Sequence, residues 1–362
     1  MKTATIGDLA RPKQWRTLSK SEMIDQGYPV YGANGIIGCA TEFTHSQPTL
    51  LIGCRGTIGA IHISAPESFV TGNAMALDSL DSTRVDINYL ARFLSWRGLS
   101  DVTTGTSQPQ LTRQNLVKVS IPLPPLPEQR RIATILDHAD ALLTKRHQVL
   151  THLQQLPMAI FREMFGDPVR NERGWPTRKL ADLGTLDRGV SKHRPRNDPA
   201  LLGGVYPLIQ TGDVANSGGY ITRWTTTYSD LGLAQSKLWP AGTLCITIAA
   251  NIAKTGILQF GACFPDSVVG FTSDTATTTY VHVWLSFLQA TLESSAPQSA
   301  QKNINLGILR TLEVPSPEPQ LLREFAQEIG ALNSTIAKNH AVQAADDELF
   351  TSLQSRAFRG EL

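Results

Sequence analysis

The feature that most constrains this chain is a junction that occurs twice. A proline-rich strip, "IPLPPLP" from Ile121, leads directly into a long charged segment with regularly spaced apolar residues, and "VPSPEPQ" from Val314 does the same. Proline disfavours helix at the residue before it but is accepted in the first helical turn, so each strip predicts an extended segment followed by a helix. A chain of 362 residues with two such junctions is expected to contain an internal repeat.

Other sequence landmarks recur in the same order, which supports the repeat. Tyr28-Pro29 matches Tyr206-Pro207. The remaining matched pairs are "GANGIIG" (32–38) with "ANSGGYI" (215–221), "TLLIGCRGTIGAI" (49–61) with "TLCITIAANIAKTGIL" (243–258), "SQPQLTRQNL" (107–116) with "AQKNINLGIL" (300–309), and "AIFREMFG" (159–166) with "RAFRGEL" (356–362). The offset between partners grows along the chain, as loop insertions in the second half would produce.

The repeat predicts the domain organisation. The expected segments are a first globular domain (1–124), a Pro-rich start with a long helix (125–166), a second globular domain (167–316) and a second long helix (317–362). Within each domain, short β-branched runs broken by Gly, Asn, Asp and Pro predict strands, and the segments 87–96 and 281–292 each predict a helix. The expected fold class is α+β: two pseudo-repeated mixed α/β domains separated by two long antiparallel coiled-coil helices, a dumbbell with a rigid bar.

Both long helices are predicted from apolar residues at alternating spacings of three and four, the pattern of a coiled-coil seam. The expected seam of the first is Ile132, Ile135, Ala139, Leu142, Val149, Leu153, Leu156 and Ile160, with Arg146 in the gap; that of the second is Leu322, Phe325, Ile329, Leu332, Ile336, Phe350 and Leu353, with Asn339, Gln343 and Asp346 as polar positions. Pro157 is expected to kink the first helix. Helices of about 35 residues, roughly 50 Å long, are expected to pack on each other or on partners.

Composition and motifs exclude several classes of protein. No apolar run has the length of a signal peptide core or of a membrane span, so a cytoplasmic protein without membrane contact is expected. The four cysteines show no metal-ligand spacing, and no phosphate-binding, zinc-protease or nucleophile motif is present. The sequence therefore predicts a protein with no catalytic residues, no metal site and no cofactor of its own.

Candidate functional residues gather in polar and basic loops, although the net charge is only +2. Arg can pair with guanine and Gln with adenine through two hydrogen bonds, and Lys and Arg neutralise phosphates. "GCRGTIG" (53–59) is interpreted as a tight strand connection, and "SKHRPRND" (191–198) as either a phosphate-contacting loop or a solvated basic turn. The expected DNA-contacting residues are Arg55, Thr57, Gln108, Gln110 and Arg113 in the first domain, and Lys192, His193, Arg194, Arg196, Lys254, Gln301 and Lys302 in the second.

The predicted architecture indicates a target with two separated parts. Two similar domains held by helices of fixed length would act as a ruler, and DNA half-sites one helical turn apart lie roughly 34–36 Å apart on one face of the duplex. Because the two domains differ in sequence, the two halves of the target are expected to differ.

At this point the chain resembles the specificity (S) subunits of type I restriction-modification systems over essentially its whole length. The resemblance is carried by the ordered set "IPLPPLPEQRRIA", "GTSQPQLT", "RGTIGA", "WPTRKLADLG" and "AFRGEL". It implies two target-recognition domains that each read one half of an asymmetric bipartite double-stranded DNA sequence, joined by helices that set the unread spacer. In the second half, "SPEPQLLREF" departs from the family pattern because it lacks the Glu-Gln-Arg of the first.

The resemblance also implies partners. Two modification subunits would methylate adenine N6, and ATP-dependent restriction subunits would translocate and cut DNA, so S-adenosylmethionine, ATP and Mg would be bound by those partners. Two other functions stay open from the residues alone: an enzyme with an unfamiliar site, for which a cluster of catalytic carboxylates or histidines is missing, and a coiled-coil scaffold that does not contact DNA. A scaffold would show no salt-dependent binding to duplex DNA.

Overall fold

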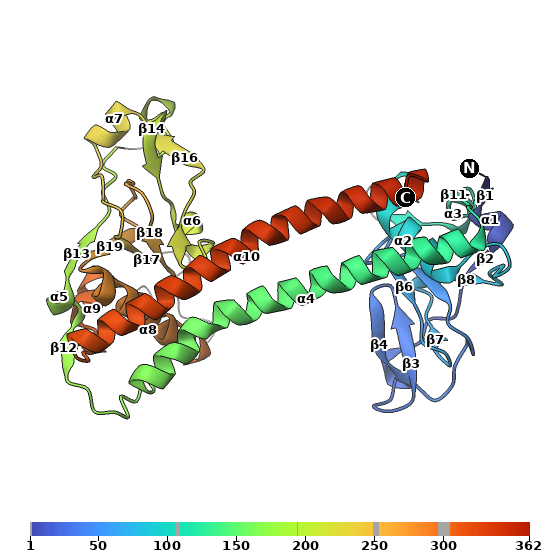
Figure 1. Cartoon of the computed structure of the whole chain (residues 1–362), viewed down its shortest axis with the longest axis horizontal. Helices are drawn as coiled ribbons and strands as arrows, with labels where there is room; N and C mark the ends of the chain where they lie inside the picture. Colours follow the sequence, from blue (N-terminus) through green and yellow to red (C-terminus); the bar gives the residue numbers. More distant parts are fainter. Residues whose placement is uncertain (1, 106–108, 194, 249–252, 296–304) are drawn as a thin grey trace. The chain divides into compact units, whose positions relative to one another are not determined.

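The computed structural model describes residues 2–105, 109–193, 195–248, 253–295 and 305–362 (Figure 1). The chain divides into two compact units: unit 1 comprises Met1–Gln148 with Ala341–Leu362, and unit 2 comprises Val149–His340. Each unit combines short strands with helices, so the predicted α+β class is confirmed. No helix in the described ranges combines the length and apolar character that a membrane span requires.

Unit 1 is built on a four-stranded sheet. Its elements are β1 (Thr3–Thr5), α1 (Ile6–Leu9), β2 (Arg11–Gln14), β3 (Tyr28–Gly32), β4 (Gly35–Ala40), β5 (Leu50–Gly53), β6 (Ile61–Ile63), β7 (Phe69–Val70), β8 (Ala74–Asp78), α2 (Ile87–Arg97), β9 (Thr103–Thr104), β10 (Gln110–Leu111), α3 (Arg113–Leu116), β11 (Ser120–Pro122) and the first part of α4 (Leu126–Phe165), with short 3₁₀ turns at Lys20–Glu22 and Ser100–Val102. The main sheet has the order β2-β8-β5-β6, and smaller sheets are β4-β3-β7, β1-β11 and β9-β10.

Unit 2 is built on a five-stranded sheet. Its elements are β12 (Thr177–Lys179), α5 (Leu180–Leu183), β13 (Thr185–Arg188), a 3₁₀ turn (Pro199–Leu201), β14 (Leu202–Leu208), α6 (Thr211–Ala215), β15 (Tyr220–Ile221), β16 (Thr226–Tyr228), α7 (Asp230–Ala234), β17 (Leu244–Thr247), β18 (Thr255–Leu258), β19 (Val268–Thr272), α8 (Thr275–Ser295), α9 (Leu306–Thr311), β20 (Glu313–Pro315) and the first part of α10 (Pro319–Arg359). The main sheet has the order β13-β19-β17-β18-β15, with β14-β16 and β12-β20 as separate pairs.

The two units repeat one topology, as the sequence landmarks predict. The order β2-β8-β5-β6 in unit 1 corresponds to β13-β19-β17-β18 in unit 2, and the pair β1-β11 corresponds to β12-β20. The predicted helices at 87–96 and 281–292 are confirmed as α2 and α8. Strand β18 ends at Leu258, and Ala262 and Cys263 beyond it form isolated bridges to Trp239 and Leu208.

A buried tyrosine supports the start of each long helix. The Tyr89 hydroxyl donates to the Pro122 carbonyl at 3.0 Å in unit 1, and the Tyr280 hydroxyl donates to the Pro315 carbonyl at 2.8 Å in unit 2. Burial raises the pKa of both phenols, which keeps the hydroxyls protonated as donors. The sequence places each of these prolines at the end of the strand that leads into α4 or α10, so the two hydrogen bonds fix equivalent junctions.

Aromatic residues from the ends of the long helices complete both cores. In unit 1, Phe358 near the end of α10 packs on Tyr89, with ring centroids 5.7 Å apart. In unit 2, Phe161 near the end of α4 packs on Tyr280 at 5.0 Å and on Phe325 near the start of α10 at 5.7 Å. Within each unit, the end of one long helix therefore lies beside the start of the other, so the two helices run antiparallel there.

The predicted seam is confirmed for α10 but is wrong in part for α4. Every predicted seam residue of α10 is at least partly buried. On α4, Leu142, Val149 and Leu156 are exposed, and the neighbouring row at Leu136, Leu143, Leu150 and Pro157 lies inward instead. Two apolar rows run side by side on α4, and both fit alternating spacings of three and four, so only tertiary contacts could distinguish them.

Two polar seam positions pair with each other. Arg146 and Asp346 form an ion pair at 2.6 Å in unit 1, which accounts for the gap in the apolar pattern of α4. Helix α4 continues through Pro157 to Phe165, although proline cannot donate the usual main-chain hydrogen bond to residue 153.

Candidate nucleic-acid interface

Most of the predicted site residues lie at one end of each main sheet, where several strands begin or end. In unit 1, β2 ends at Gln14 opposite Met75, and β5 ends at Gly53 opposite Ala74, so both strands end where β8 begins. In unit 2, β13 ends at Arg188 and β17 ends at Thr247, where β19 begins. We call this end of each sheet the loop edge. The loops that carry Arg55 in unit 1, and Lys192 and Lys254 in unit 2, leave from it.

The β5–β6 connection is a tight turn, as predicted for "GCRGTIG". The Gly59 amide donates to the Gly53 carbonyl at 2.8 Å. A side chain at Gly53 would place its Cβ only 2.1 Å from the Thr57 carbonyl oxygen, so glycine is required there. Gly56 adopts a φ of +76°, which a residue with a side chain rarely adopts. This turn presents Arg55 and Thr57 to solvent.

The second group of predicted residues in unit 1 lies against the same turn. The Leu111 amide donates to the Cys54 carbonyl at 3.3 Å, so Gln110 lies close to Arg55. Thr112 caps α3 by accepting from the Asn115 amide, and Arg113 is the first residue of that helix. Gln110 and Arg113 are both exposed. Gln108, the remaining predicted residue of this unit, lies outside the described residues.

In unit 2, the basic loop is held by a segment distant in the sequence. The Gln235 side-chain oxygen accepts from the amides of Lys192 at 2.6 Å and His193 at 3.1 Å. The Ser236 hydroxyl donates to the Val190 carbonyl at 2.7 Å. These contacts fix the main chain at the start of the loop. Sequence reasoning missed Gln235 and Ser236, because nothing local marks contacts across more than forty residues.

Carboxylates accompany the cations of this loop. His193 lies 3.1 Å from Asp198, and Arg196 is ion-paired with Asp266. A hydrogen bond from the Ala200 amide is the main cause that lowers the pKa of Asp198, and His193 is the next largest. This carboxylate therefore stays charged. Lys192 is exposed and stands at the start of the loop. In the described part of this loop, Asp198 and Asp266 thus lie beside His193 and Arg196, while Lys192 stays exposed.

The remaining predicted residues of unit 2 are only partly described. The Lys254 amide donates to the Thr247 hydroxyl at 3.1 Å, and the Thr247 amide donates to the Lys254 carbonyl at 2.9 Å, which places Lys254 at the loop edge. Arg194, Gln301 and Lys302 lie outside the described residues.

Further cations that the sequence did not single out lie near this edge. The Arg188 side chain donates to the Asp266 carbonyl at 2.9 Å, and Asp266 also binds Arg196. Lys237 and Arg310 both approach Asp187, at 3.8 and 3.6 Å. These residues come from separate segments of the chain, so they form a cluster only in the folded protein.

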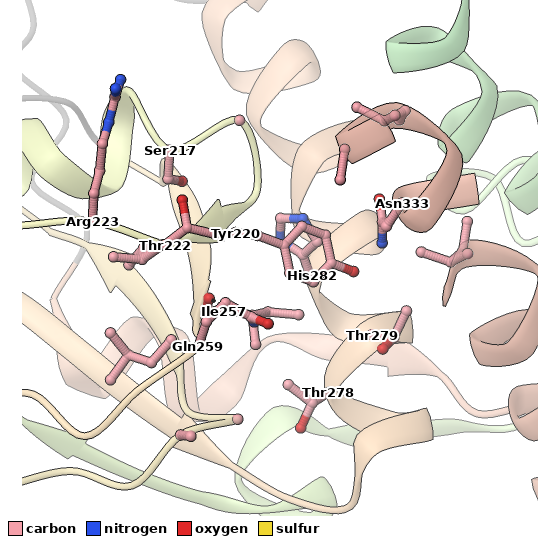
Figure 2. Close-up of a pocket in the computed structure, with 18 of the residues that line it drawn as sticks. Ser217, Tyr220, Thr222, Arg223, Ile257, Gln259, Thr278, Thr279, His282 and Asn333 are labelled. Atoms are coloured by element: carbon pink, nitrogen blue, oxygen red, sulfur yellow. Dashed lines mark hydrogen bonds between the residues drawn. The ribbon is translucent and has the colours of Figure 1, made fainter. Parts of the chain in front are cut away.

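Unit 2 also contains a cleft of about 1830 Å³ between its sheet, α8 and its part of α10 (Figure 2). The His282 Nδ1 lies 2.9 Å from the Thr255 hydroxyl, and the Tyr220 ring meets the His282 ring edge-on at 6.1 Å. Burial lowers the pKa of His282 to about 4, so its ring is neutral at pH 7. Burial raises the pKa of Tyr220, and a hydrogen bond with Asn333 opposes that shift. Across the described residues, no group of His, Cys, Asp and Glu could hold a metal ion.

The half-buried His282 predicts that stability depends on pH. An unfolded chain protonates this histidine near pH 6.5, whereas the folded chain does so only near pH 4, so unfolding takes up a proton between these values. The free energy of unfolding should fall by up to about 2 kcal/mol between pH 7 and pH 5. Urea denaturation at both values measures this loss. The side chains of Asp213, Arg223 and His340 also line this cleft. In H282N, the share of the loss in unfolding free energy that comes from residue 282 should disappear. A loss of the same size in H282N would contradict the prediction.

A family model for the type I restriction modification DNA specificity domain matches residues 1–153 and 172–336. The chain belongs to this family. The two matched segments correspond to the two halves of the repeat, so the resemblance identified from the sequence is confirmed. The model describes a DNA specificity domain and not a catalytic domain, as expected for a non-catalytic subunit.

Curated relatives carry the same description. The type I restriction enzyme EcoprrI specificity subunit of Escherichia coli is 26% identical over 147 residues, and the MjaIX specificity subunit of Methanocaldococcus jannaschii is 26% identical over 160 residues. These alignments cover 39% of this chain in each case, and only 36% and 37% of the two relatives. The EcoBI specificity subunit of Escherichia coli is 23% identical over 391 residues, which covers 94% of this chain and 76% of that relative.

Solved structures from type I restriction-modification systems share the fold. The type I S subunit from M. genitalium matches with a TM-score of 0.65 at 14% identity, covering 99% of this chain and 96% of the other. A chain from a study of complex assembly and conformational transition in the type I system matches with a TM-score of 0.60 at 15% identity, covering 100% and 98%. At these identities the likeness shows the fold alone.

Proposed function

We propose that this chain is the subunit of a type I restriction-modification complex that reads an asymmetric, bipartite DNA sequence, with one half read by each unit. One observation carries the proposal: the two units present different Arg-, Lys- and Gln-bearing loops at the same edge of equivalent sheets. Equivalent scaffolds with different side chains suit a target whose halves differ in sequence. Arg55 and Gln110 have the donor and acceptor groups to read base edges, and Lys192 and Lys254 can neutralise phosphates.

We assign the recognition domains to residues 1–124 and 167–316, and the long-helix segments to 125–166 and 317–362. The shared strand order supports equivalent roles for the two domains. In this proposal the helices fix the unread spacer between the halves. S-adenosylmethionine, ATP and magnesium would be bound by the modification and restriction subunits, which the chain would position on the DNA.

Adenine methylation mapped across a genome tests the proposal. A host would express the chain with the modification subunit of its own system, and a second host would express that modification subunit alone. We expect a bipartite motif with a fixed gap to be methylated only when the chain is present. A folded complex that methylates no such motif would contradict the proposal and favour the scaffold function.

The base-reading role of the unit 1 loops gives a residue-level prediction. In the assembled complex, R55A and Q110A should each relax the required base at one or two positions of a single half-site, with a loss of about 1–3 kcal/mol per position. Methylation rates on duplexes with single changes in each half measure this loss. K145A, on an exposed position of α4, serves as the control and should leave the motif unchanged. Equal weakening on all sequences would instead indicate phosphate contact.

An exposed apolar row on the long helices of unit 1 supports the proposed modification partner. Leu142 and Leu349 are 62% and 66% exposed, and Val342 is 45% exposed. Arg146 pairs with Asp346 in antiparallel helices, so Leu142, about one turn earlier on α4, lies level with Leu349, about one turn later on α10. Leu142, Val342 and Leu349 each come directly before a residue of the seam between the two helices. In an antiparallel pair of helices, the residues directly before the seam positions lie on the same side of the pair. This row suits an apolar helix of a partner subunit.

Charge on this row should weaken assembly. The double variant L142E and L349E is expected to reduce co-purification of the modification subunit at least about tenfold, because glutamates would have to be desolvated in the interface. Size-exclusion chromatography of the co-expressed complex measures the effect. T144E with A345E places two glutamates at other exposed positions of the same helices and should leave assembly intact. Equal losses in both double variants would contradict a specific surface.

A further inference from the structure

The hairpin formed by β3 and β4 in unit 1 carries two solvent-exposed isoleucines. Ile36 is 62% exposed and Ile37 is 48% exposed. The hairpin is closed by a two-residue connection, since Gly32 pairs with Gly35, and β3 and β4 lie side by side in Figure 1. Because β7 pairs with the other side of β3, β4 is an edge strand. Adjacent large apolar side chains on an exposed strand near its turn are costly in water and favour self-association unless something covers them.

A β-bulge aims both isoleucines outward. Val30 pairs with Gly38, but the next residue, Tyr31, pairs with Ile36, so Ile37 is an extra residue in β4. In a regular strand, consecutive side chains point to opposite faces, and a bulge changes that alternation locally. Ile37 lies over Gly32, because a Cβ added to Gly32 would be 3.1 Å from the Ile37 Cγ2 atom. Ile37 therefore rests on the hairpin backbone and leaves Ile36 as the more exposed of the two.

The tip of this hairpin contacts the loop edge of unit 1. An added Cβ at Gly53 would lie 2.7 Å from the Ala33 carbonyl oxygen, so the hairpin turn packs directly on the start of the loop that carries Arg55. On the other side, an added Cβ at Gly35 would lie 3.7 Å from the His62 ring in β6. The exposed isoleucines are thus continuous with the candidate nucleic-acid interface.

We propose that this hairpin enters the major groove of the half-site read by unit 1, where Ile36 contacts the C5-methyl group of a thymine. The inference rests on the proposed function and adds a specificity-determining residue to it. Strand β7 pairs with β3 only at Val30 and Tyr31, so the tip beyond these residues is two-stranded. A two-stranded ribbon fits the major groove, and thymine is the base that presents a methyl group there. Arg55 and Gln110 can read polar base edges, whereas an isoleucine can recognise only an apolar one. Burial of that contact also accounts for two exposed isoleucines beside a polar loop.

Uracil substitution tests the contact, because it removes only the thymine methyl group. The assembled complex would be given its methylation target as duplexes in which each thymine of the unit 1 half is replaced singly by uracil. One replacement should weaken binding and methylation about fourfold, the effect of losing one buried methyl group. The same replacement should have no effect on the complex carrying I36A, which itself should bind the thymine duplex more weakly.

A matched control comes from the other end of the same hairpin. Ile24 is 38% exposed and bridges Cys39 near the open end of the hairpin, away from the turn. I24A should retain the full uracil effect of the unchanged complex. The uracil series on the unchanged chain requires no variant to fold, so it stands even if I36A is unstable.

Three outcomes would overturn the inference. The unchanged complex could methylate its motif with no response to uracil anywhere in the unit 1 half, or I36A could keep the full uracil response. Alternatively, I36A could lose its modification subunit while its motif stays the same, which would identify the hairpin as a protein contact. In all three cases the proposed function stands. A complex that methylates no motif would overturn the proposed function, and this inference with it.

Discussion

The substitution F161A is expected to lower the free energy of unfolding of unit 2 by about 3–5 kcal/mol. Phe161 is fully buried and contacts the rings of Phe165, Tyr280, Phe287 and Phe325. Truncation to alanine would remove these contacts and leave a cavity where the end of α4 meets the start of α10. Urea denaturation, with hydrogen exchange of the α8 amides as a local probe, measures the effect.

The control is L156A, a change of apolar volume on an exposed position of the same helix. It should cost less than about 1 kcal/mol, because surface substitutions away from special features have small effects. Similar losses for both variants would show that the aromatic cluster does not hold α4 in unit 2. Since the chain has two units, each transition must be followed by its own probe and not by one global midpoint.

Q129A is expected to cost about 2–4 kcal/mol in unit 1, because it would leave several buried main-chain groups without partners. The fully buried Gln129 side chain accepts from the Asp86 amide at 2.8 Å and donates to the carbonyls of Arg84 and Pro124, both at 2.9 Å. These bonds tie the first turn of α4 to the start of α2. Urea denaturation gives the loss, and faster exchange of the Asp86 amide would locate it.

The corresponding position in unit 2 is a leucine, which suggests a second variant for this test. Gln129 lies seven residues after Pro122, and Leu322 lies seven residues after Pro315, where it packs on the apolar core of unit 2. Q129L should nevertheless destabilise unit 1 nearly as much as Q129A, because the main-chain groups around residue 129 would still lack partners. E128A, at the neighbouring helix position, removes only a surface pair with Arg131 and should cost about 0–1 kcal/mol. A stable Q129L would mean that the fold of unit 1 does not depend on these hydrogen bonds.

Features set by local sequence were predicted well. The repeat, the helices α2 and α8, and the start of each long helix follow from proline positions, turn residues and apolar spacing within short windows. The inward row of α4 was not determined in this way, because Leu142 and Leu143 fit the spacing equally well and only the surrounding unit distinguishes them. The exposure of Ile36 was likewise hidden, since "GANGIIG" gives a turn but not the bulge beside it.

For the candidate interface, sequence located the loops but not what holds them. The Arg55 turn could be predicted from its glycines, since they are adjacent in the chain. The partners of the basic loop, Gln235 and Asp266, lie far away in the sequence and become neighbours only through the strand order of unit 2. Polar loops are common, so their composition alone could not show that these are positioned and partly neutralised before binding.

The burial of Phe358 has a consequence for the order in which the protein matures during synthesis. Phe358 packs on Tyr89, Phe93 and Trp96, so the core of unit 1 includes a residue that the ribosome adds only after all of unit 2. Unit 2 is a single continuous stretch, Val149–His340, and can close its core earlier. Unit 1 therefore begins to emerge before unit 2 but is completed after it, and until then its aromatic site for Phe358 is unfilled.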